Sequence, residues 1–98
     1  MYLEDGVGLG GNIMKYLISY DLKNPGRNYD DLIKAIKAYG TWASICRSCW
    51  SIKTDCTAAQ IRDNLKQYID NNDILFVCDY NNWAAYNLPQ EVADWLKK

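Results

Sequence analysis

The chain has 98 residues, of which 49% are hydrophobic and 23% are charged, a composition typical of one globular domain with a small core. Its formal net charge of -1 argues against a protein that coats nucleic acid by bulk charge, because such affinity comes from many lysines and arginines that release counterions. The chain contains no histidine, which removes the commonest general base and any nucleophile activated by histidine. The composition therefore favours binding over catalysis, and any contact with nucleic acid has to be local or use a metal ion.

No apolar run approaches the roughly 20 residues of a membrane span, and no secretion signal is visible. We therefore expect a cytoplasmic protein that makes no membrane contact and keeps its four cysteines as reduced thiols. Cys46 and Cys49 have the spacing of two zinc ligands, but a structural zinc site needs four ligands, so no zinc is expected. A catalytic redox dithiol needs a helix N-terminus to stabilise its thiolate, whereas this pair flanks a predicted hairpin turn.

Residues 1–13 differ from the rest of the chain, since they contain four glycines without a period. This composition predicts a flexible lead-in that is not part of the core, followed by a single domain over residues 14–98. The segment Gly10–Ile13, directly before Met14, is also what a bacterial ribosome-binding site would encode if it were translated in frame. We therefore hypothesise that Met14 is the native start, although Met1 remains the alternative.

The first regular elements are a strand and a helix. The segment Met14–Asp21 alternates in polarity and is rich in Tyr, Ile and Leu, which predicts a β-strand. After a turn that contains Pro25 and Gly26, Asn28 can cap a helix that Gly40 ends. The apolar residues of this helix follow the 3.6-residue period, and they are Tyr29, Leu32, Ile33, Ile36 and Tyr39.

Two strands are predicted next, at 41–46 and 49–54, around a turn at Arg47 and Ser48. A second helix then begins near Asp55 or Thr57, because Thr57 and Gln60 have the spacing of a capping box. Its apolar stripe consists of Ala58, Ile61, Leu65, Tyr68 and Ile69.

A short apolar run over 74–80 predicts the last strand, and Asn87 and Pro89 open a terminal helix. The order is βαββαβ with an added helix, which predicts an α+β, ferredoxin-like fold. Such a fold has a four-stranded antiparallel sheet, with neighbours in the order 4-1-3-2, and two helices on one face. The terminal helix or a partner subunit is expected to cover the other face.

Asp21 stands where the first predicted strand ends, a position at which small α/β folds often bind a cation or a substrate. The alternative is that Asp21 only forms the turn, since an aspartate side chain readily accepts a backbone N–H. In the predicted topology, Arg47, Ser48 and Asp73 approach Asp21 from neighbouring strand ends, while Asp79 lies at the far end of the sheet.

The turn after Asp21 adds Lys23 and Arg27 to this set. Oxygen ligands from Asp21 and Asp73 would suit Mg²⁺ or Mn²⁺, which can activate water or neutralise a phosphate. The sequence thus offers Asp21 as a candidate catalytic residue and metal ligand, and Asp73 as a second metal ligand. The candidate binding residues around them are Lys23, Arg27, Arg47 and Ser48.

Several motifs resemble the small bacterial and phage proteins labelled "SinR family", over about residues 14–98. They are Met14–Leu22, Gly40–Trp42, Ser48–Trp50, Thr54–Asp55, Ile61–Asp63, Leu88–Glu91 and Asp94–Leu96. More distantly, the element order and the dipeptide Tyr20–Asp21 are similar to the small CRISPR-associated endoribonuclease and to the VapD toxin ribonucleases. This resemblance implies a ferredoxin-like homodimer in which Asp21 of each subunit is associated with a divalent metal at the interface.

The aromatic residues, which include four tryptophans and eight tyrosines, could stack on bases. Six of them fall on predicted apolar faces and are expected in the core, namely Tyr16, Tyr20, Tyr29, Tyr39, Tyr68 and Trp95. Trp42, Trp50, Trp83 and Tyr86 are less committed and could line the open sheet face as a dimer interface or a ligand pocket. The loop that contains Trp83 and Tyr86 is the segment we expect to take part in recognition, with a simple connector as the alternative.

Three classes of function follow. The first is a dimeric protein that binds nucleic acid or a nucleotide without catalysis. The second is a metal-dependent endoribonuclease that uses Asp21. The third is a protein-interaction module of phage or mobile-element origin, such as an inhibitor of host defence.

Overall fold

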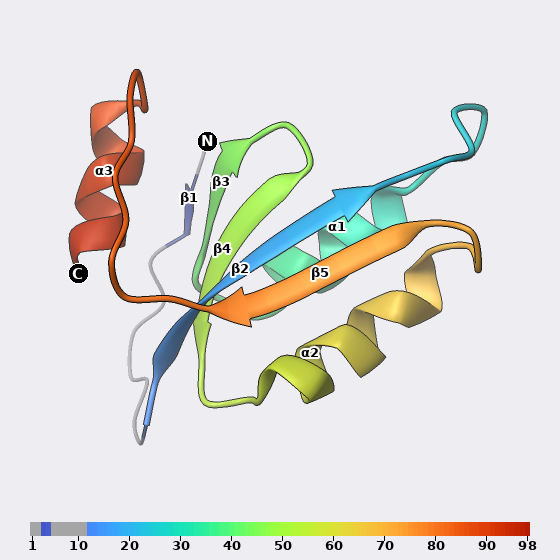
Figure 1. The fold of residues 1–98 in the computed structure, drawn as a ribbon, viewed down its shortest axis with the longest axis horizontal. Coiled ribbons are helices and arrows are strands. Elements are labelled where there is room, and N and C mark those ends of the chain that lie inside the picture. Colours follow the sequence, from blue (N-terminus) through green and yellow to red (C-terminus); the bar gives the residue numbers. More distant parts are fainter. Residues whose placement is uncertain (1–2, 5–11) are drawn as a thin grey trace.

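The computed structural model describes residues 3–4 and 12–98 and shows an α+β fold (Figure 1). In chain order the elements are β1 (Leu3–Glu4), β2 (Met14–Asp21), α1 (Asp30–Lys37), β3 (Trp42–Cys46), β4 (Cys49–Thr54), α2 (Ala58–Leu65), η1 (Lys66–Tyr68), β5 (Ile74–Asp79) and α3 (Gln90–Lys97). The predicted lead-in over 1–13 lies mostly outside the described residues, and within it Leu3–Glu4 forms β1. In the described part of the chain, no helix is both long and apolar enough to cross a membrane.

The strands form one antiparallel sheet in the order β1-β3-β4-β2-β5. Without β1 this is the predicted 4-1-3-2 order, so the ferredoxin-like prediction is confirmed. Asp21 lies opposite Ile74, whereas Asp79 lies opposite Tyr16, so Asp21 and Asp79 are at opposite ends of the sheet as expected. The strand β5 forms one edge of the described sheet.

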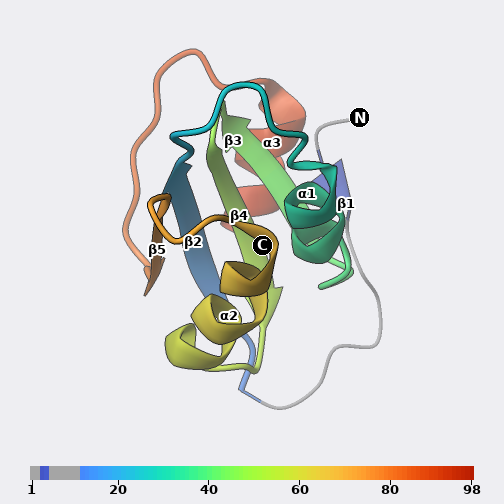
Figure 2. The same ribbon diagram turned by 90° about the vertical axis from the view of Figure 1, so that its right-hand side faces the viewer.

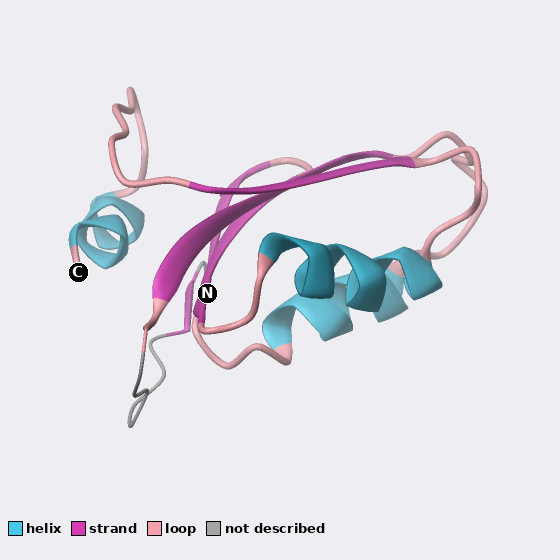
Figure 3. Cartoon of the chain, turned by 60° about the horizontal axis from the view of Figure 1, so that its bottom comes forward, coloured by secondary structure: helices cyan, strands magenta, loops and turns pink. Residues whose placement is uncertain are grey.

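The helices α1 and α2 cover one face of the sheet, which we call the helix face, while α3 lies behind the other face (Figure 2). Figure 3 shows the same layer of two helices along one side of the sheet. Fully buried aliphatic side chains from the strands and the two helices meet there: Ile18, Leu32, Ile36, Ile52, Ile61 and Leu65. Burial of such side chains contributes about 1.5–3 kcal/mol each, so this layer holds most of the hydrophobic stabilisation.

Local signals in the sequence account for where the helices begin and end. Thr57 Oγ1 accepts a hydrogen bond from the backbone N–H of Gln60, and the Gln60 side chain accepts one from Thr57, which completes the predicted capping box. Asn28 accepts a hydrogen bond from the backbone N–H of Asp30 at 2.8 Å, although the regular helix begins at Asp30 with Tyr29 in the N-cap position. Gly40 ends the first helical segment with φ of +88°, a conformation that glycine adopts without strain.

Trp42 and Trp50 lie on the helix face, each 8% exposed, with ring centroids 5.4 Å apart. Lys37 of α1 places its ammonium 4.8 Å from the Trp42 ring centroid, and Trp50 donates a hydrogen bond to the Tyr20 hydroxyl at 3.0 Å. These two tryptophans therefore pack in the core and do not line the open sheet face, which was one of the expected placements.

The second face of the sheet is only partly covered. Ala43 of β3 packs against Val92, Trp95 and Leu96 of α3, all of which are buried. Ile74 and Phe76 of β5 are 54% and 58% exposed, because α3 lies over the β3 side of the sheet and not over β5. The second face thus has a covered half and an open half.

Candidate functional site: an aromatic pocket and a polar loop network

The carboxylate of Asp21 lies at the end of β2 and is 62% exposed. Its Oδ2 accepts a hydrogen bond from the Lys23 ammonium at 2.7 Å. An exposed pair of this kind contributes between zero and about 1 kcal/mol, so the contact leaves Asp21 available to solvent and ligands.

Asp73 serves mainly to connect two loops. Its Oδ1 accepts a hydrogen bond from the backbone N–H of Lys23 at 2.7 Å. Its Oδ2 accepts from the Tyr29 hydroxyl at 2.9 Å and from the backbone N–H of Asp70 at 2.8 Å. Both oxygens of Asp73 therefore hold the loop after β2 against the loop before β5.

Arg27 belongs to the same polar network. Its guanidinium pairs with Asp70 and lies 5.0 Å from the ring centroid of Tyr29. Asn24 donates a second hydrogen bond to Asp70 at 2.6 Å. Because the guanidinium of Arg27 already pairs with Asp70, it is less available to bind a ligand.

The turn between β3 and β4 reaches this end of the sheet. The carbonyl of Ser48 accepts a hydrogen bond from the backbone N–H of Tyr20 at 3.1 Å, so the turn lies beside the end of β2. Ser48 adopts φ of +61°, and the Arg47 side chain beside it is exposed. The structure therefore brings the predicted residues around Asp21 into one region, but mainly through contacts that shape loops.

A metal ion would find few ligands there. Among residues 3–4 and 12–98, no group of three or more cysteine, aspartate or glutamate side chains is placed to hold a metal. Asp21 offers one exposed carboxylate, while Asp73 already makes three hydrogen bonds. Mg²⁺ and Mn²⁺ prefer several oxygen ligands, so a second subunit or a bound phosphate would have to supply the others.

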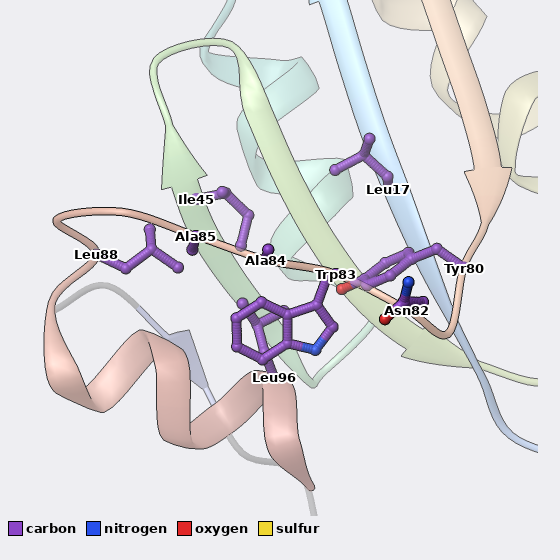
Figure 4. A pocket seen from close by; sticks show the side chains of 9 residues that line it. All are labelled: Leu17, Ile45, Tyr80, Asn82, Trp83, Ala84, Ala85, Leu88 and Leu96. Carbon is purple, nitrogen blue, oxygen red and sulfur yellow. The ribbon is translucent and has the colours of Figure 1, made fainter.

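A pocket of about 260 Å³ lies on the covered half of the second face, between the sheet, α3 and the segment that connects β5 to α3 (Figure 4). We call it the aromatic pocket. Its lining is mostly apolar, and it consists of Leu17, Ile45, Tyr80, Asn82, Trp83, Ala84, Ala85, Leu88 and Leu96. The connecting segment has no regular secondary structure, yet it supplies most of this lining.

Tyr80 is a fixed wall of the aromatic pocket. Its hydroxyl shares a 2.5 Å hydrogen bond with Ser51 Oγ, which itself donates to the carbonyl of Tyr16 at 2.9 Å. Burial raises the pKa of Tyr80, and the charges of Cys49 and Cys78 add to this rise, whereas the hydrogen bond with Ser51 lowers it. The side chain is therefore neutral and held in place at neutral pH.

Lys15 places a positive charge beside Tyr80. Its ammonium lies 5.6 Å from the ring centroid of Tyr80 and donates a hydrogen bond to the carbonyl of Leu96 at 2.6 Å. An ammonium has three donors, so this hydrogen bond leaves donors for an anionic group. The aromatic pocket thus combines an apolar cavity with the ammonium of Lys15 beside its Tyr80 wall.

Of the two aromatic residues that the sequence singled out in this loop, only Trp83 lines the pocket, and its side chain is partly buried. Tyr86 is 90% exposed and is not part of the lining. Sequence reasoning did not single out Tyr80, Leu17 or Leu96 as binding residues, because each belongs to a predicted strand or helix. Within the predicted strand over 74–80, Tyr80 is an even number of residues from Ile74 and Phe76, and this period of two was a signal that it shares their face of the sheet.

The fold and this pocket define the protein as a ferredoxin-like α+β domain with an aromatic pocket on its second sheet face. No family model matches the chain. The function is therefore argued from the site itself.

Proposed function

We propose that this protein binds a nucleotide, or single bases of a nucleic-acid strand, without cleaving it. The observation that carries the proposal is the aromatic pocket, in which Trp83 and Tyr80 supply ring surfaces beside a cavity of about 260 Å³. Such a cavity suits one planar ring system, and stacking of a base on an aromatic side chain contributes about 1–3 kcal/mol. Asn82 at the edge of the cavity offers both a donor and an acceptor for the edge of a base.

The charge distribution supports local binding of this kind. Lys15 is beside Tyr80 and can meet a phosphate, whereas Lys23 and Arg27 are paired with Asp21 and Asp70. Because few phosphates would be neutralised, we expect the binding constant to depend only weakly on salt. A plot of the logarithm of the binding constant against the logarithm of the salt concentration should have a slope of about -1, as for one or two ionic contacts.

The test is binding of the four ribonucleoside monophosphates and of fluorescein-labelled oligouridine and oligothymidine, measured by calorimetry and anisotropy. We expect Trp83→Ala to weaken binding about 5-fold to 150-fold, which corresponds to the stacking energy. Tyr86→Ala removes an exposed ring of the same loop and should change the affinity by less than about threefold. Equal binding by wild type and Trp83→Ala, with unchanged circular dichroism, would refute the pocket as the base site.

A metal-dependent endoribonuclease is the second candidate, favoured by the exposure of Asp21 at a strand end. It is tested by incubating RNA and DNA with Mg²⁺ or Mn²⁺, with and without chelator. Our proposal expects intact substrate in every lane. Cleavage that disappears with chelator and in Asp21→Ala, but persists in Asp55→Ala at the other end of the sheet, would establish the nuclease instead.

We also propose that the protein is a homodimer, in which a second copy meets the exposed β5 edge. This edge contains no lysine or proline, which commonly protect edge strands, and Ile74 and Phe76 are more than half exposed. Light scattering should show a dimer for wild type and for Met14→Lys, and a monomer for Phe76→Lys. A monomeric wild type that also fails to bind nucleotides would favour the protein-interaction module.

A further inference from the structure

Cys46 and Cys49 lie directly opposite each other, at the last paired position before the turn between β3 and β4. The turn has only two residues, and Ser48 closes it with φ of +61°. Opposite residues of antiparallel strands have Cα atoms about 4.5–5.5 Å apart. This range falls within the separation of about 4.4–6.8 Å that a disulfide requires.

The two side chains interact. Cys49 is partly buried, and burial raises the pKa of its thiol to about 11, with further contributions from the charge of Cys46, from a hydrogen bond with Cys46 and from the charge of Cys78. Cys46 is exposed to solvent. The pair thus consists of one accessible thiol and one protected, protonated thiol within reach of it.

The topology excludes the other close pairing. Cys78 is on β5, and β2 lies between β5 and β4. Two strand spacings correspond to about 9–10 Å, which exceeds the Cα separation that a disulfide can span. Cys56 lies before α2, and its side chain packs against the core of the helix face.

We propose that Cys46 and Cys49 are a modification site that a hydroperoxide oxidises reversibly to an intramolecular disulfide. The Cys46 thiolate attacks the outer peroxide oxygen, the O–O bond breaks, and the leaving oxygen takes up a proton, which gives a sulfenic acid and water or an alcohol. The Cys49 sulfur then displaces the hydroxyl group, which leaves as water with the Cys49 proton. The two thiols lose two electrons and two protons in total, and the peroxide gains them.

The proposed reaction is slower than that of a catalytic dithiol, because no helix N-terminus stabilises a thiolate at this hairpin and the resolving thiol is protonated at neutral pH. The oxidised cysteine pair lies next to the aromatic pocket, because Ile45, which directly precedes Cys46 in β3, lines that pocket. The proposal does not depend on the identity of the ligand.

The experiment treats the reduced full chain with hydrogen peroxide or cumene hydroperoxide and follows thiol count, intact mass and peptide mass. We expect the loss of two thiols and two hydrogen atoms, a cross-linked Cys46–Cys49 peptide, and full recovery with dithiothreitol. Cys56→Ser and Cys78→Ser should form the same disulfide, whereas Cys46→Ser should not.

Four surviving thiols under conditions that oxidise free glutathione would overturn the proposal. Sulfinic acid at Cys46 without a disulfide, a disulfide that includes Cys78, or a disulfide between two chains would overturn it as well. Because Cys46 is exposed, Cys46→Ser is expected to fold, and circular dichroism checks this.

Discussion

The two faces of the sheet both carry tryptophan, but they use it differently. On the helix face, Trp42 and Trp50 are buried under two helices and fill the core. On the second face, α3 buries Trp95, while Trp83 comes from an irregular segment and borders a cavity. The difference shows that the face closed by two helices uses its tryptophans for packing, whereas the face covered by one short helix also leaves the ring of Trp83 at a cavity.

The largest expected effect tests whether α3 is an integral layer of the fold. Trp95 is 1% exposed, so Trp95→Ala should lower the free energy of unfolding by about 3–5 kcal/mol. Urea denaturation followed by circular dichroism measures this change. A loss below about 1 kcal/mol would mean that α3 contributes little to the stability of the fold. The difference in packing between the helix face and the second face would then be larger than the burial of Trp95 indicates.

The next prediction compares two carboxylates near the end of β2: Asp73, which holds loops together, and Asp21, which is exposed to solvent. Asp73→Ala removes three hydrogen bonds to a charged group and should cost about 2–3 kcal/mol of stability. Asp21→Ala removes one exposed ion pair and should stay within about 0.5 kcal/mol of wild type. Similar losses in both variants, measured by thermal and urea unfolding, would contradict this division of roles.

A third prediction concerns pH and the wall of the aromatic pocket. Because burial raises the pKa of Tyr80 in the folded state, the unfolded chain ionises first as the pH rises through about 10. The folded protein then holds more protons at Tyr80 than the unfolded chain, so the contribution of Tyr80 to stability is constant below this pH and falls above it. Tyr80→Phe should lose about 1 kcal/mol near neutral pH, through the hydrogen bond with Ser51, and should show a shallower decline above pH 10.

Three tyrosines of the helix face, buried Tyr16 and partly buried Tyr20 and Tyr39, also have raised pKa values and keep part of the decline in that variant. Unfolding curves at several alkaline pH values give the slopes. An unchanged slope in Tyr80→Phe would show that the helix face alone causes the alkaline loss of stability.

The last prediction compares the lysines that lie over tryptophan rings on each face. The ammonium of Lys37 lies 4.8 Å from the ring centroid of Trp42. Lys37→Ala should therefore lower the free energy of unfolding by about 0.5–1 kcal/mol. Lys53 approaches Trp95 to 4.2 Å and also donates to the carbonyl of Trp95, so Lys53→Ala should cost about 1 kcal/mol more. The reverse order in urea denaturation would show that the helix face depends more on its cation.

Much of the fold could be predicted because its signals are local. The capping box at Thr57 and Gln60, Gly40 at a helix end and the alternation of β2 each act over a few residues. Some boundaries moved, since the second helix becomes regular only over Ala58–Leu65 and continues as η1. The last turn of a helix often has 3₁₀ geometry, as η1 does here, so the exact end of the regular helix is less predictable than its start.

The candidate site was less predictable. Asp21, Asp73 and Arg27 were placed in one region by topology, yet their hydrogen bonds depend on how two loops meet. The aromatic pocket joins β2, β3, the segment after β5 and α3, which are distant in sequence. No periodicity within one element predicts such a meeting.

By itself, the sequence determined the order of elements, the helix caps and the apolar stripes, because backbone conformation and side-chain period are local properties. Only the tertiary structure decided that Trp42 and Trp50 are buried, that Trp83 borders a cavity, and that α3 leaves the β5 half of the second face open. Strand register and the docking position of a helix are set by long-range packing, and these choices decide which side chains become core and which remain available for binding.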